Sequence, residues 1–265
     1  MDKNKVDIDD TNISLDLSDA TQAVKENRFQ DAILLLKRIL KDQPDNIDAL
    51  YLSAVSSRFL KKFDESKSYI MDLLSNAPDM GRAYQEYGHL NRDQGNEEKA
   101  VMHYRQACEL NPALLASWNF LYQYFTKYKN KPAADHAEEQ LKKLKSLPSL
   151  LLYISQILNE GRLGLAEEKC RAFLKKNPTH TYAMSLLAEI ANRLGYFDDA
   201  EFLLEKAVEF SPDDGDLRTK YAEILRKKQK FSKTMEQVEI LCEKFPNNLN
   251  YKAQKASEIM QNGDH

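Results

Sequence analysis

Histidines and paired carboxylates are the side chains of this sequence that could bind a metal or transfer a proton. Glutamate pairs such as Glu97-Glu98, Glu138-Glu139 and Glu167-Glu168 stand at expected helix starts, where the helix dipole favours negative charge. The histidines lie far apart, without ligand partners at metal-binding spacing. We therefore predict no catalytic residue, no metal site and no cofactor. The histidines are His89, His103, His136, His180 and His265.

Glycine motifs and cysteines add no chemistry. The sequence has no GxxxxGK[ST] phosphate loop, no GxGxxG motif and no HExxH motif. Gly161 and Gly164 lie close together, but in an expected helix-helix turn without lysine or serine beside them. Cys108, Cys170 and Cys242 are far apart, each in an expected second helix of a pair, so we interpret them as reduced and mostly buried thiols.

Composition limits the kinds of partner. The formal net charge is −3 with a pI near 6.0, whereas nucleic-acid binding normally requires a clustered basic face. No run reaches the roughly 18 apolar residues of a membrane helix, and the polar start MDKNKVDIDDTNISLD lacks a signal-peptide core. We expect a cytoplasmic protein with no nucleic-acid partner and no membrane insertion.

The elements that position these side chains follow a fixed period. Six of the eight prolines fall into two series in which neighbours are 34 residues apart. A fixed period of this size predicts a solenoid of stacked repeats. The prolines are Pro44, Pro78 and Pro112, then Pro178, Pro212 and Pro246.

One repeat, 81–114, shows the pattern of two amphipathic helices joined by a tight turn. Gly95 can adopt the left-handed conformation that ends the first helix, and Pro112 stops the second. The residues that predict the two helices recur at steps of three and four positions. They are Tyr84, Tyr87, Gly88, Val101, Tyr104 and Ala107.

This 34-residue unit, with its aromatic pair, its small residues Gly88, Ala100 and Ala107 and its closing Asn-Pro, resembles the tetratricopeptide repeat (TPR). The resemblance implies an all-α, right-handed α-solenoid that binds partners on its concave face. The 35-residue pentatricopeptide repeat would drift off the proline series. The seven aligned repeats are 13–46, 47–80, 81–114, 115–146, 147–180, 181–214 and 215–248.

The fourth repeat and the two ends depart from the pattern. We expect residues 1–12 to be disordered, and 249–265 to form a capping helix or, as we favour, a truncated eighth repeat with Gly263 at its turn. The aromatic fourth repeat is either a repacked joint between two sub-arrays or a floor for a ligand or a dimer contact. Self-association through this repeat or the end helices is therefore possible. Its aromatic residues are Trp118, Phe120, Tyr122, Tyr124, Phe125 and Tyr128.

Helical phase predicts which side chains line the concave face. The group of Arg58, Arg82, His89 and Arg92 beside Tyr51 could accept an acidic peptide or a C-terminal carboxylate by bidentate pairing. Of the carboxylate-clamp residues of chaperone-binding TPR proteins, only Arg82 has a match. The predicted partner-binding residues are Tyr51, Arg58, Arg82, Gln85, His89, Arg92, Asn119, Gln123, Glu189, Asn192 and Arg193, with Val55, Ser185, Glu223 and Arg226 on the same face.

The second half carries a further resemblance. The run LLAEIANRLGYFDDAEFLLEKAVEFSPDDGDLRTKYAEILRKKQKF, followed by FPNNLNYKAQKASEIMQNGD, is similar to the N-terminal repeats of bacterial TPR-containing sulfotransferases. Two functions remain open. The first is a non-catalytic scaffold that binds a peptide or partner protein in its concave groove. The alternative is the N-terminal substrate- or partner-binding module of a longer sulfotransferase.

Overall fold

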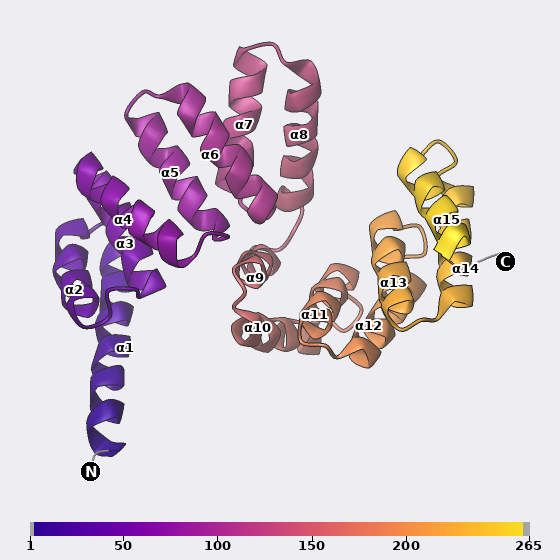
Figure 1. Cartoon of the computed structure of the whole chain (residues 1–265), viewed down its shortest axis with the longest axis horizontal. Coiled ribbons are helices and arrows are strands. Elements are labelled where there is room, and N and C mark those ends of the chain that lie inside the picture. Colours follow the sequence, from indigo (N-terminus) through magenta and orange to yellow (C-terminus); the bar gives the residue numbers. More distant parts are fainter. Residues whose placement is uncertain (1–2, 262–265) are drawn as a thin grey trace. The chain divides into compact units, whose positions relative to one another are not determined.

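The computed structural model describes residues 3–261, and this part of the chain consists of helices without a strand (Figure 1). The helices are α1 (Lys3–Lys25), α2 (Phe29–Asp42), α3 (Ile47–Phe59), α4 (Phe63–Asn76), α5 (Gly81–Asp93), α6 (Glu97–Leu110), α7 (Leu115–Lys127), α8 (Lys131–Lys145), α9 (Ser149–Asn159), α10 (Leu163–Lys176), α11 (Thr181–Arg193), α12 (Phe197–Phe210), α13 (Gly215–Lys227), α14 (Phe231–Lys244) and α15 (Leu249–Gln261).

The chain divides into two compact units, which we call the N-terminal unit (Met1–Pro148) and the C-terminal unit (Ser149–His265). Within each unit an odd-numbered helix packs against the next even-numbered helix as a hairpin, and each hairpin packs against the following one. Helix α15 packs against α14. The all-α solenoid class predicted from the sequence is confirmed. The odd-numbered helices are the first helices of the repeats, and they carry the predicted binding residues.

The turns within the hairpins share one backbone conformation. Gly95 has a φ of +79°, in the left-handed region where a Cβ is unfavourable. The N–H of Asn96 then donates to the carbonyl of Asn91 at 2.8 Å, which closes the end of α5. At the same place in other repeats Lys61 and Gln229 have φ values of +60° and +58°, so the turn forms there without glycine.

Small residues let the paired helices approach closely. A Cβ added at Gly88 on α5 would lie 2.8 Å from the ring of Tyr104 on α6, and Ala100 and Ala107 are fully buried. Burial raises the pKa of the Cys108 thiol to about 12 and that of Cys170 to about 11, so both stay protonated. These residues hold the hairpins together and carry no exposed reactive group.

The two ends of the described chain are helical. Helix α1 begins at Lys3, so residues 3–12 are helical where the sequence predicts disorder. Extending a helix beyond a packed segment costs little, because each added residue gains a hydrogen bond after nucleation. Helix α15 ends at Gln261, and Gly263 lies outside the described residues. Within the described residues, no helix is long and apolar enough to cross a bilayer.

Candidate partner-binding surface

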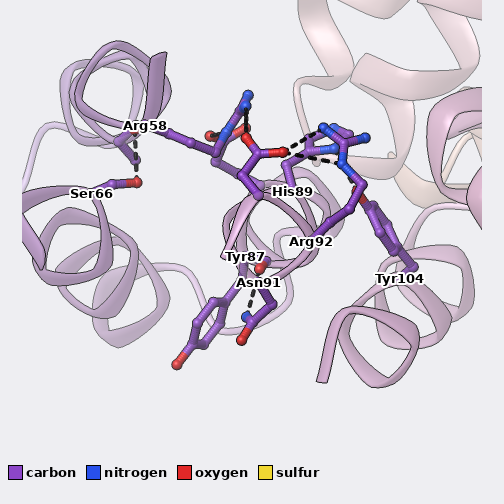
Figure 2. Close-up of polar contacts among 10 residues, drawn as sticks. Arg58, Ser66, Tyr87, His89, Asn91, Arg92 and Tyr104 are labelled. Atoms are coloured by element: carbon purple, nitrogen blue, oxygen red, sulfur yellow. Dashed lines mark hydrogen bonds and ion pairs between the residues drawn. The ribbon is translucent and has the colours of Figure 1, made fainter. Parts of the chain in front are cut away.

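Arg58, predicted to bind a partner, is instead buried between two first helices of the N-terminal unit (Figure 2). Its Nε donates to Glu86 Oε1 on α5 at 2.5 Å, and its Nη1 donates to Asp93 Oδ2 at 2.7 Å. Its side chain is 8% exposed and that of Glu86 is 3% exposed. The end of α3 faces the next first helix, so Arg58 points into the stack. Its guanidinium already has two carboxylate partners.

Arg92 completes this charged network from the solvent side. Its Nη2 lies 2.9 Å from Asp93 Oδ1, so Asp93 accepts hydrogen bonds from two arginines. Burial raises the pKa of the Glu86 carboxyl, and the Arg58 guanidinium opposes that rise. Burial also acts to raise the pKa of Asp93, but the hydrogen bonds from Arg58 and Arg92 outweigh it and the pKa is lowered. The positive charges of the two arginines therefore balance the negative charges of the two carboxylates.

His89 packs beside this network and is neutral. Its Nδ1 lies 2.6 Å from the hydroxyl of Tyr104, which is fully buried. Burial, then the charges of Arg58 and Arg92, lowers the pKa of His89 to about 4. Burial raises the pKa of Tyr104, so its hydroxyl stays protonated and donates a hydrogen bond to His89 Nδ1. His89 is thus a hydrogen-bond acceptor for the core.

The remaining predicted residues of the N-terminal unit lie on three first helices. The guanidinium of Arg82 on α5 stacks over the ring of Tyr51 on α3, 4.6 Å from its centroid. Gln85 Oε1 accepts a hydrogen bond from Ser117 Oγ on α7 at 3.0 Å. Asn119 and Gln123 on α7 are exposed. The side-chain amides of Asn119 and Gln123 are therefore accessible to a partner.

In the C-terminal unit the predicted residues on α11 are partly engaged. Arg193 pairs with Glu189 at 2.8 Å and also donates to the carbonyl of Leu158 at 3.0 Å. Asn192 Oδ1 accepts from Lys227 Nζ on α13 at 2.8 Å. These contacts connect neighbouring first helices, as Arg58 does in the N-terminal unit.

A groove of about 630 Å³ runs between the first helices α11, α13 and α15 of the C-terminal unit. A small hollow adjoins it and shares Ser185, Lys220 and Glu223 with its lining. Lys220 Nζ donates to Ser185 Oγ at 2.9 Å across the groove floor. Ser185 and Glu223 were predicted on this face, and Glu189 and Asn192 line the adjoining hollow.

Sequence reasoning missed other residues that line this groove. Tyr182, Asp216 and Asn250 occupy the place in their repeats that Arg82 occupies in 81–114. The repeat period, followed from one first helix to the next, was the signal that would have found them. Among the described residues, no three histidine, cysteine or carboxylate side chains are placed so that together they could hold a metal ion.

Several solved structures resemble the chain at low identity. The Naa15/Naa10 structure bound to HypK-THB shares 16% identity and covers 93% of this chain, with a TM-score of 0.46. The APC/C hetero-tetramer Cut9-Hcn1 shares 15% over 91%, with a TM-score of 0.42. A thermophilic TPR protein of Thermus thermophilus shares 18% over 94% of this chain and 99% of its own, with a TM-score of 0.36. The chain spans only 38% and 48% of the first two proteins.

Family models give the more direct comparison. No curated protein matched the sequence. Two models described as tetratricopeptide repeats match, one over residues 81–114 and the other over residues 158–224. The first of these is the predicted third repeat, formed by α5 and α6. The chain therefore contains tetratricopeptide repeats.

Proposed function

We propose that this chain is a non-catalytic scaffold that binds a peptide, or an extended segment of a partner protein, along its first helices. The groove of about 630 Å³ in the C-terminal unit carries the proposal. Its lining comes from three successive first helices and includes the polar side chains Ser185, Thr219, Asn250 and Gln254. An extended chain has unpaired backbone N–H and C=O groups at every residue, and such side chains can pair with them.

For the N-terminal unit, the proposed contacts are the predicted residues that face solvent. Asn119 and Gln123 are exposed on α7, and Arg92 is 44% exposed. We exclude Arg58 from the proposed contact residues because its pairing with Glu86 holds it inside the stack. An acidic or C-terminal ligand for this unit stays a prediction. The sulfotransferase similarity also stays a prediction and adds no residue to the site.

Site-specific photo-crosslinking tests the proposal. A photoreactive phenylalanine analogue at Gln254 places the probe in the groove, and one at Phe202 on α12 places it outside the groove lining. Phe202 is 59% exposed and Gln254 is half-buried, so the control probe is the more accessible of the two. In cells that make the protein, we expect polypeptide adducts from position 254 and not from position 202. Equal adducts from both positions, or none from 254, would refute groove binding. Circular dichroism checks that both variants stay helical.

A further inference from the structure

The groove of the C-terminal unit has an excess of negative charge. The charged residues of its lining are Asp214, Asp216, Lys220 and Glu223, three carboxylates against one ammonium. Asp214 caps α13, because its Oδ1 accepts the backbone N–H of Leu217 at 3.1 Å. Among the described residues Asp216 and Glu223 form no ion pair, and both are exposed. The groove thus presents two carboxylates that no other side chain neutralises.

The single ammonium in the lining does not compensate for them. Lys220 lies between Asp216 and Glu223 on α13, but its Nζ donates to Ser185 Oγ on α11 at 2.9 Å. A hydroxyl partner leaves the carboxylates without a counter-charge. Elsewhere in this unit, Glu201 pairs with both Lys228 and Lys230. A cationic ligand would supply the positive counter-charge for the groove carboxylates, as these lysines do for Glu201.

Two tyrosines in the lining favour the same kind of ligand. Tyr182 on α11 and Tyr251 on α15 are half-buried and border the groove. Aromatic rings attract arginine and lysine through the negative face of the ring. The protein contains such a contact in its other unit, where Arg82 stacks over Tyr51 at 4.6 Å. A basic side chain can therefore stack on a ring here while it pairs with a carboxylate.

We propose that this groove takes a basic segment of a partner polypeptide, with one arginine or lysine paired to Asp216 and another to Glu223. The proposal rests on the proposed function and specifies its ligand for this unit. Asp216 and Glu223 are two helical turns apart on one face of α13, about 10 Å at a rise of 1.5 Å per residue. In a polyproline II segment, side chains three residues apart are separated by about 9 Å. The fitting ligand is therefore an extended Arg-x-x-Arg segment.

Fluorescence polarisation with three labelled peptides tests this directly. The probes are a Pro/Ser/Gly peptide with two arginines in the Arg-x-x-Arg spacing, and its versions with both arginines changed to glutamine or to glutamate. We expect the arginine peptide to bind most tightly and to weaken as salt is added. The double variant Asp216→Asn/Glu223→Gln should bind the arginine peptide about tenfold more weakly, as expected for the loss of two partly exposed charge pairs.

Two further variants separate the local effect from net charge. Glu236→Gln/Glu243→Gln removes the same charge at the same spacing from α14, outside the groove lining, and should leave the affinity of the arginine peptide unchanged. Lys220→Gln removes the ammonium and keeps a donor for Ser185, so it should tighten binding of the arginine peptide about twofold to fivefold. An acidic ligand would respond to Lys220→Gln in the opposite direction.

The outcomes distinguish this proposal from the wider function. Equal binding of the three peptides, with no effect of the groove variants, would overturn the charge proposal while groove crosslinking at Gln254 still supports the scaffold. Tighter binding of the glutamate peptide would also overturn it. Absence of binding by the arginine peptide at millimolar concentration refutes the proposed ligand, and loss of crosslinking at Gln254 as well refutes the function itself.

Discussion

Arg58 on α3 and Glu86 on α5 form an ion pair, with 2.5 Å between Nε and Oε1, and both side chains are almost completely buried. The pair joins the first helices of two successive repeats. Arg226 occupies the place in 215–248 that Arg58 occupies in 47–80, and its Nη2 pairs with Glu258 on α15, which is 1% exposed. An arginine at the end of a first helix therefore connects its repeat to the next one in both units.

We predict that Arg58→Met destabilises the protein by about 3–5 kcal/mol, because it leaves the Glu86 carboxylate buried without its partner. Arg92→Met is the control. The Arg92 side chain is 44% exposed, so its loss should cost at most about 1 kcal/mol. Urea unfolding followed by circular dichroism measures both. If Arg58→Met costs no more than Arg92→Met, the buried pair does not stabilise the stack.

Gly88→Ala should destabilise the protein by about 1–3 kcal/mol, because the new methyl group would lie 2.8 Å from the ring of Tyr104 and would force α5 and α6 apart. Gly164→Ala on α10 is the matched control. Its added Cβ meets no atom within 4 Å, and alanine favours helix, so a gain of up to about 1 kcal/mol is expected. Thermal unfolding of the two variants should shift in opposite directions. Equal shifts would mean that close packing at Gly88 is unimportant.

The helical hairpins could be predicted from the sequence because their signals are local. Gly95 ends α5 and Pro112 follows α6 by constraints on single residues, and Gly88 marks a close helix approach. The period then shows which residues are equivalent. The signals within one hairpin predict its two helices, and the 34-residue period of the prolines adds the stacking of hairpins that defines the confirmed fold class.

The surface could be predicted only in part, because it depends on contacts between repeats. Helical phase places Arg58 on the same face as Arg92. It cannot show that Arg58 forms a buried ion pair with Glu86 of the next repeat while Arg92 stays exposed. The charge of the groove likewise depends on Lys220 turning toward Ser185. A one-helix projection contains no information on which residue of the next helix lies opposite.

Non-glycine residues in the left-handed turns give a stability prediction. Gln229 has a φ of +58° at the turn where Gly95 and Gly195 stand in other repeats. A side chain at this positive φ destabilises the folded protein by about 1–2 kcal/mol relative to glycine. Glycine also gives the unfolded chain more conformational freedom, which offsets about 0.5–1 kcal/mol of the gain. Gln229→Gly should therefore stabilise the protein by about 0.5 kcal/mol, and Gly195→Ala should destabilise it. Chemical denaturation of both variants checks this, and stabilisation by Gly195→Ala would contradict it.

His89 predicts how stability depends on pH. Burial first, then the charges of Arg58 and Arg92, lowers its pKa from 6.5 to about 4 in the folded state. As the pH falls below 6.5, His89 becomes protonated in the unfolded chain but stays neutral in the folded protein, so the free energy of unfolding decreases between pH 6.5 and 4. At about 1.4 kcal/mol per pKa unit, the loss from this residue is up to about 3 kcal/mol.

The substitution His89→Gln isolates this contribution. Glutamine can still accept the hydrogen bond of the Tyr104 hydroxyl, but it does not titrate, so its stability should fall less steeply as the pH is lowered. The measurement is the free energy of unfolding of both proteins in urea at pH 7 and at pH 4.5. Changes at Asp93 and other carboxylates are common to both proteins and cancel in the difference. Parallel pH curves would show that His89 accepts a proton in the folded state as easily as in the unfolded chain.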